Sequence, residues 1–147
     1  MPSNSLSVRL YRKFKNRTKL YIYTPLIAYW LFLFSLSTIP VDAVPILFEI
    51  QDKVEHFLAY MVLAVLLNFT LHFQRRIESV AAKSFLFTLI FIFLYAAVDE
   101  VHQIFIPGRY CDPLDWIADS LGGVIGTISV RFFLLSVEKN MELSSAK

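Results

Sequence analysis

The sequence predicts an all-α integral membrane protein whose fold is a bundle of four membrane-spanning helices. Hydrophobic residues make up 56% of the 147-residue chain, which is more than an ordinary soluble domain carries. Four long apolar runs are separated by short polar stretches. Each run approaches the roughly 20 residues that a helix needs to cross about 30 Å of hydrocarbon. The basic and acidic residues stand in separate blocks along the chain.

The apolar runs place the four expected spans at residues 20–39, 56–73, 84–106 and 114–137. The first run is too long for the core of a cleaved signal peptide, and no small-x-small cleavage site follows it. The fourth run is interrupted only by Asp115, Asp119 and Arg131. The chain is therefore expected to consist of a basic N-terminal tail, a four-span membrane domain and a C-terminal tail, at residues 1–19, 20–137 and 138–147.

The charged residues predict the orientation of the chain, because short cytoplasmic loops retain lysine and arginine. One side has 12 of the 14 basic residues: Arg9, Arg12, Lys13, Lys15, Arg17, Lys19, Arg75, Arg76, Lys83, Arg131, Lys139 and Lys147. The other side has nine of the 12 acids: Asp42, Glu49, Asp52, Glu55, Asp99, Glu100, Asp112, Asp115 and Asp119. Both termini are therefore expected in the cytoplasm. The basic N-terminal tail is either a topology signal or a segment that binds an anionic leaflet.

The start of the second span combines helix-start signals with a buried histidine. Asp52 is expected at the N-cap and Glu55 three residues later, where both would bind free backbone N–H groups. Lys53, His56 and Tyr60 follow at i, i+3 and i+7 and share one stripe of the helix. A histidine one turn inside the membrane needs a polar partner, and both a structural hydrogen bond and a functional role remain open for His56.

Two adjacent acids, Asp99 and Glu100, are expected inside the far boundary of the third span. Asp99 shares a face with His102 and Gln103, whereas Glu100 is expected to be rotated away. An unpaired carboxylate near hydrocarbon costs several kcal/mol, so a cation should meet these acids. The candidates are a protonated histidine, a bound metal, Lys53 and Arg109.

The fourth span begins with a cap and continues with two acids on one face. Asp112, followed by a proline, is expected at the N-cap. Asp115 and Asp119 lie one turn apart. Asp119 is too far along the helix to cap it, so its side chain should point into the bundle toward His56, Asp99 and His102. Gly122 and Gly126 form a small-xxx-small pattern that permits close approach of another helix, including that of a second copy in a homodimer.

Three segments match ordered patterns. Residues 52–60 fit D-K-x-x-H-F-x-x-Y, residues 99–109 fit D-E-x-x-Q-x-F-x-P-G-R, and residues 115–122 fit D-x-x-x-D-x-x-G. The chain thereby resembles the VanZ-like family of small bacterial membrane proteins over roughly residues 20–135. The resemblance implies a multi-pass protein of the plasma (inner) membrane, and a role in the cell envelope similar to that of the family member linked to resistance to the glycopeptide teicoplanin. It implies no particular reaction.

The resemblance also marks the motif residues, and His102 lies at a variable position of the pattern. As residues of a catalytic site we consider His56, Asp99, Glu100 and Asp119. As ligand-binding residues we consider Lys53, Gln103, Arg109 and Asp115. In this hypothesis the two cations hold an anionic group, and His56 and an acid act as base and acid.

Two classes of function remain open. The first is an envelope protein, enzyme or binding protein, whose outer polar pocket holds a lipid, a cell-wall precursor or a glycopeptide with a phosphate or sugar group. The second is a scaffold or small transporter whose polar cluster only ties helices together. Membrane lipids are expected partners, and nucleic acid is not.

The sequence identifies no cofactor. No stretch resembles a dedicated metal-binding motif, and the single cysteine, Cys111, excludes a cysteine-based zinc site and an internal disulfide. A metal bound by His56, His102 and two carboxylates stays an alternative.

Overall fold

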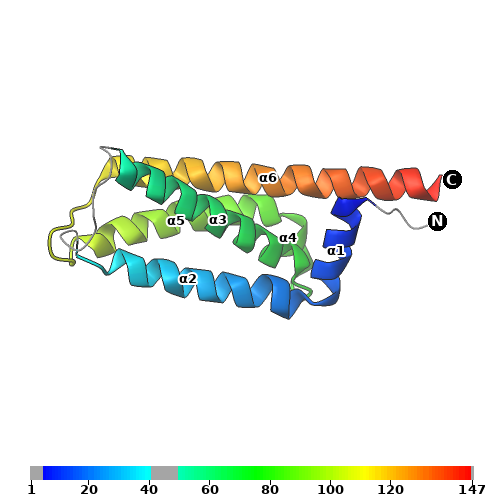
Figure 1. Cartoon of the computed structure of the whole chain (residues 1–147), viewed down its shortest axis with the longest axis horizontal. Helices are drawn as coiled ribbons and strands as arrows, with labels where there is room; N and C mark the ends of the chain where they lie inside the picture. Colours follow the sequence, from blue (N-terminus) through cyan, green and yellow to red (C-terminus); the bar gives the residue numbers. More distant parts are fainter. Residues whose placement is uncertain (1–4, 41–49, 147) are drawn as a thin grey trace.

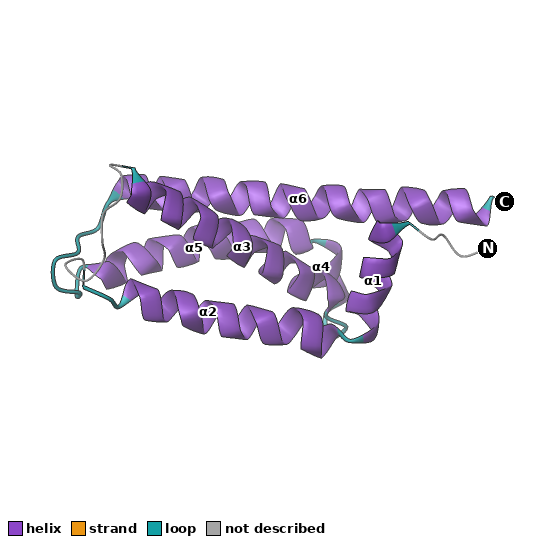
Figure 2. Cartoon of the chain, viewed as in Figure 1, coloured by secondary structure: helices purple, strands orange, loops and turns teal. Residues whose placement is uncertain are grey.

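The computed structural model describes residues 5–40 and 50–146, and within these residues all regular structure is helical. The elements are α1 (Leu6–Asn16), η1 (Lys19–Tyr23), α2 (Thr24–Ser37), α3 (Gln51–Phe73), α4 (Glu78–Ala82), α5 (Ser84–Gln103) and α6 (Pro113–Ser145). The four long rods run side by side along one axis, and the two short helices lie at one end (Figure 1, Figure 2). Asp42 and Glu49, two acids expected on the outer face, lie outside the described residues.

In the part of the chain that the structure describes, four helical segments are long and apolar enough to cross a membrane: Lys19–Ser37, Gln51–Phe73, Ser84–Gln103 and Pro113–Ser145. The first is continuous, because η1 is a single wide turn that leads directly into α2. These segments confirm the all-α fold with four candidate spans. Many large apolar side chains on their outer surfaces are exposed, for example Leu31 at 63%, Leu94 at 64% and Phe132 at 69%. Lipid is the solvent that suits such a surface.

Helix α6 packs along α3 through two glycines. A Cβ at Gly122 would collide with the carbonyl oxygen of Phe57, and a Cβ at Gly126 would collide with that of Met61. Because the obstacles are backbone atoms, only glycine permits this approach. The face of α6 that contains these glycines therefore packs against α3 of the same chain. A homodimer through Gly122 and Gly126 stays a prediction, and it would require α3 to move.

Helix α1 was not predicted from the sequence, because residues 1–19 were expected to form only a basic tail. It runs across the end of the bundle (Figure 1), with Val8 fully buried. The Tyr11 ring lies 5.1 Å from that of Phe73, and the Phe14 ring 5.5 Å from that of Phe69. Burial raises the pKa of Tyr11 above its ordinary value, and the nearby carboxylate of Glu138 raises it further.

Candidate functional site

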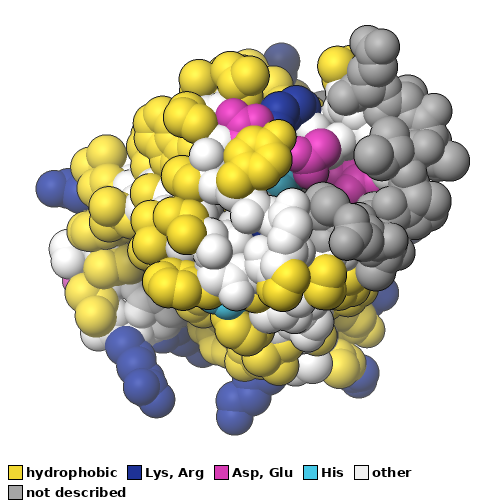
Figure 3. Space-filling view, turned by 90° about the vertical axis from the view of Figure 1, so that its left-hand side faces the viewer, with side chains coloured by type: hydrophobic (Ala, Val, Ile, Leu, Met, Phe, Trp, Pro, Cys, Tyr) yellow, Lys and Arg dark blue, Asp and Glu magenta, His cyan; other side chains and the backbone are white. Residues whose placement is uncertain are grey.

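The polar residues of the three motifs meet at the end of the bundle where α3 begins, α5 ends and α6 begins (Figure 1). Seen from this end, acidic side chains and a histidine lie among apolar ones (Figure 3). The chain order explains the convergence, because α3 and α6 start where α5 stops. Residues far apart in the sequence thereby become neighbours.

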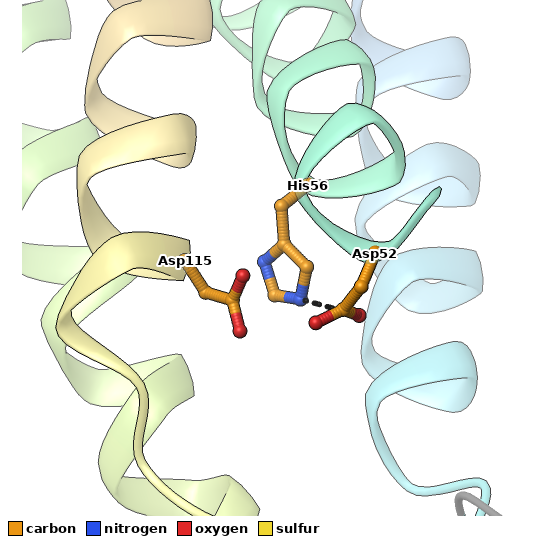
Figure 4. A group of neighbouring side chains, drawn as sticks. All are labelled: Asp52, His56 and Asp115. Carbon is orange, nitrogen blue, oxygen red and sulfur yellow. Dashed lines mark ion pairs between the residues drawn. The ribbon is translucent and has the colours of Figure 1, made fainter. Parts of the chain in front are cut away.

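His56 is the centre of this group. Its Nδ1 lies 3.0 Å from Oδ1 of Asp119, which is completely buried. Its Nε2 lies 3.9 Å from Oδ1 of Asp52, so the two ring nitrogens face two different carboxylates. Figure 4 shows the ring between Asp52 and Asp115. The expectation that Asp119 points into the bundle is confirmed, and its partner is His56.

Lys53 connects α3 to the start of α6. Its Nζ lies 2.6 Å from Oδ2 of Asp112 and 2.5 Å from Oδ1 of the buried Asp115, and 3.4 Å from Oδ2 of Asp52. Asp112 is the N-cap of α6, as predicted, and its Oδ1 accepts a hydrogen bond of 2.9 Å from the backbone N–H of Leu114. The hydrogen bond from Lys53, together with that from Leu114, holds the pKa of Asp112 below its ordinary value.

The expectation for Glu100 was wrong, because this side chain faces the interior. It is 2% exposed, and its Oε2 accepts a 2.7 Å hydrogen bond from the backbone N–H of Asp112. The buried stripe of α5 consists of Ser84, Thr88, Ile92, Ala96, Glu100 and Gln103. The regular four-residue spacing of this stripe from Ser84 to Glu100 is the sequence signal that indicates where Glu100 points.

Asp99 and His102 flank that stripe and have partners other than His56. Asp99 accepts a 3.2 Å hydrogen bond from the hydroxyl of Tyr60, which was noted in the sequence only as part of the α3 stripe. The His102 ring stacks on Phe34 with centroids 5.3 Å apart. A metal site that includes both His56 and His102 therefore has no support in the described geometry.

The predicted capping role of Asp52 was also wrong. Helix α3 begins at Gln51 with Ile50 at the N-cap position and no side-chain cap. Asp52 is therefore inside the first turn, where its carboxylate favours the helix dipole but cannot cap the helix. Its side chain instead lies near Lys53 and His56. Glu55 accepts a 2.7 Å hydrogen bond from Nε2 of Gln51.

A cavity of about 390 Å³ adjoins His56. Its polar wall consists of Ser37, Asp52, Glu55, His56, Tyr60, Asp99, Gln103 and Arg109. Its other wall consists of apolar parts of α2 and α3: Tyr29, Phe32, Leu33, Leu36, Leu58, Ala59 and Val62. Phe32, Leu36 and Leu58 are exposed, so this wall is continuous with the outer surface of the bundle. Arg109 donates from Nε to the carbonyl oxygen of Ile39 at 2.9 Å.

Among residues 5–40 and 50–146, two groups of side chains have the composition and spacing to hold a metal ion. One consists of Asp52, His56 and Asp115, and the other of His56, Glu100 and Asp119. In each group the potential ligand atoms lie within 4.8 Å of one another.

The family model described as VanZ/LLP1 matches residues 4–134. This range includes every site residue named above. No curated protein and no solved structure matches the chain.

Proposed function

Since the chain belongs to the VanZ/LLP1 family, we propose that it binds an amphipathic molecule of the bacterial cell envelope in the cavity between α2, α3 and α5. The observation that carries this proposal is that one cavity is lined by both polar and apolar side chains. A lipid or lipid-linked precursor has the same two parts. Its apolar chain would lie against α2 and α3, and its phosphate or sugar headgroup would lie near His56, Asp99 and Arg109.

The exposed side chains of the apolar wall support entry from the membrane. Phe32 is 55% exposed and Leu36 is 41% exposed. Both belong to the segment Lys19–Ser37, which is the least buried of the four candidate spans. A ligand chain could therefore enter from the lipid without crossing water. Because lipid is itself apolar, the binding free energy would come from van der Waals packing of the chain and from polar contacts of the headgroup.

The His56–Asp119 pair supports a chemical step on the bound headgroup. Asp119 fixes the ring through Nδ1, whereas Nε2 faces Asp52 on the cavity wall. A histidine oriented in this way can accept a proton at Nε2. We therefore propose His56 as the base of any modification reaction, with Asp119 as the residue that orients it.

The scaffold function remains the second candidate, because Lys53 joins α3 and α6 through ion pairs with Asp112 and Asp115. Interhelical polar contacts in membranes average about 0.6 kcal/mol each. Such contacts alone do not require a cavity beside them, which is why the binding function is preferred.

The orientation proposed for the chain puts the site on the outer side of the plasma membrane, with both termini in the cytoplasm. Helix α1 and the last turns of α6 lie at the same end of the bundle, opposite the site (Figure 1). The α3–α5 connection with Arg75 and Arg76 also lies at that basic end. The positive-inside rule favours the cytoplasm for this end.

Photochemical labelling tests the binding proposal. The purified protein, reconstituted in nanodiscs with a trace of phospholipid whose acyl chain bears a diazirine, should become labelled on α2 and α3. Leu36→Trp fills the cavity and should reduce this labelling. Leu31→Trp is the matched control, because Leu31 lies on α2, is 63% exposed and does not line the cavity. Equal labelling of the two variants and the wild type would contradict the proposal.

A susceptibility assay tests the role in the envelope. Expression in a teicoplanin-susceptible bacterium should raise the inhibitory concentration of the glycopeptide, and His56→Gln should remove the increase while the membrane yield is unchanged. Loss of yield together with the phenotype would favour the scaffold function.

A further inference from the structure

We propose that His56, Glu100 and Asp119 bind a divalent transition-metal ion, of which Mn²⁺ and Zn²⁺ are the expected examples. This inference goes beyond the binding of an amphipathic molecule, and it is tested without any lipid ligand. It replaces the role of His56 as a base, because a neutral imidazole that binds an ion through Nδ1 carries its proton on Nε2. The three side chains come from α3, α5 and α6, so the ion would join the three helices that form the buried part of the bundle.

The geometry of the His56–Asp119 pair suits two neighbouring ligands of one ion. Their nearest atoms, Nδ1 and Oδ1, are 3.0 Å apart. Two ligands with bonds of about 2.1 Å at right angles are separated by about 3.0 Å. With Glu100, the potential ligand atoms all lie within 4.8 Å of one another, so small side-chain movements would complete the site.

Two buried carboxylate oxygens without hydrogen-bond partners support the proposed metal site. Oε1 of Glu100 and Oδ2 of Asp119 accept no hydrogen bond from the residues in the ranges 5–40 and 50–146. The two side chains are only 2% and 0% exposed. Leaving a buried charged oxygen without a partner is costly. A metal ion within this group would supply the missing partner for carboxylates that the fold has already buried.

The local charge is also unbalanced. Five carboxylates surround Lys53 and His56: Asp52, Glu100, Asp112, Asp115 and Asp119. Within the described ranges, their ion pairs use only these two cationic side chains. Arg109 has no ion pair with these five carboxylates among the described residues, and its Nε donates to the carbonyl oxygen of Ile39. A divalent cation would reduce the net negative charge at this depth in the membrane.

The other group of potential ligands is less suitable. In the group of Asp52, His56 and Asp115 (Figure 4), the ammonium group of Lys53 already lies 2.5 Å from Asp115 and 3.4 Å from Asp52. A metal ion there would face a fixed positive charge. Glu100 and Asp119 have no ion pair with a lysine or arginine among the described residues, so the second group is assigned as the site.

The ligand chemistry indicates the class of metal. An imidazole nitrogen with carboxylate oxygens favours a first-row transition metal over Ca²⁺ or Mg²⁺, which prefer oxygen ligands alone. His56 also lines the cavity, so the ion would be adjacent to a bound headgroup. A positive ion at this position would attract a phosphate despite the nearby carboxylates of Asp52 and Asp99.

Titration with Mn²⁺, followed by electron paramagnetic resonance, tests the site directly. The full chain, without a polyhistidine tag, is purified in detergent and treated with EDTA. We expect it to remove one Mn²⁺ per chain from the free pool. Glu100→Gln and Asp119→Asn should each weaken this binding by about tenfold or more. Glu78→Gln, on the exposed surface of α4, and His72→Gln, at the opposite end of α3, are matched controls that should leave it unchanged.

Two results would overturn the assignment. The first is the absence of saturable binding of Mn²⁺ and Zn²⁺ by the wild type up to about 1 mM. The second is equal affinity of folded Glu100→Gln and the wild type. If neither variant folds, pulsed measurements on wild-type protein with Mn²⁺ decide the question. A hyperfine coupling from one imidazole nitrogen is expected, and its absence would refute the role of His56.

Discussion

Lys53 supplies the positive charge at the start of α3 for the acids of α6. Asp115, one of its partners, is 4% exposed, so removal of the ammonium group would leave a buried carboxylate without its counter-charge. Lys53→Met should destabilise the protein by about 3 kcal/mol. Thermal unfolding in detergent measures this effect. Lys53→Met combined with Asp115→Asn should recover most of the loss, and no recovery would show that Lys53 acts in another way.

The carboxylate of Asp112 should make the protein less stable at low pH, because its hydrogen-bond partners favour the ionised form. Lys53 holds the pKa of Asp112 below its ordinary value in the folded protein. The stabilising effect of this carboxylate is therefore complete above about pH 4, the ordinary pKa of aspartate, and is lost as the pH falls through the lower folded-state pKa. The unfolding temperature of the wild type should exceed that of Asp112→Asn at pH 6, and the difference should shrink toward pH 3. A constant difference would contradict this explanation.

At the level of single residues, the sequence predicted which side chains belong to the site better than it predicted their directions. Asp119 was expected to point into the bundle, and there it meets His56 at 3.0 Å but not Asp99 or His102, which have other partners. The predicted direction of Glu100 was wrong because the inward face of this helix was inferred from its polar residues, such as Asp99 and Gln103. The packing of small and apolar residues along α5 sets the actual rotation.

At the level of helices, the close contact of α3 and α6 is the feature most sensitive to substitution. Gly122→Ala adds a methyl group against the backbone of Phe57, which cannot rotate away as a side chain could. The helices must separate, at a cost of about 1–3 kcal/mol. Thermal unfolding should show a clear decrease for Gly122→Ala and a much smaller one for Ile125→Ala, a position on the same helix that is 46% exposed. Similar decreases for both would argue against this packing.

Helix positions could be predicted from the sequence, but most helix ends could not; the start of α6 after the N-cap Asp112 is the exception. Runs of apolar residues report the thickness of hydrocarbon, so they located all four candidate spans. They do not report where the backbone stops being helical. Helix α3 begins five residues before the apolar run from His56, and α6 continues to Ser145 beyond the predicted end at residue 137. Helix α1 was not predicted because its 11 residues are too few to cross a membrane, and long apolar runs were the signal used to locate helices.

For the whole molecule, the proposed orientation places the single cysteine at the outer end. Cys111 is exposed and lies between α5 and α6, near the site. A membrane-impermeant maleimide should label Cys111 in intact cells, or in spheroplasts if an outer membrane is present. In Cys111→Ser with Ser79→Cys, which moves the thiol to the exposed surface of α4, labelling should require permeabilised membranes. The reverse pattern would invert the topology.

Helix α6 has 33 residues, which corresponds to a length of about 50 Å, well beyond the roughly 30 Å of hydrocarbon. Its last turns must therefore leave the bilayer as helix, and α1 supports them there, with Ser7 lying 3.4 Å from Asn140. A soluble protein whose first helix continues in register from Ser145 would be joined without a hinge. Such a rigid fusion would give this 147-residue protein enough mass outside the micelle to be aligned as single particles in electron cryomicroscopy.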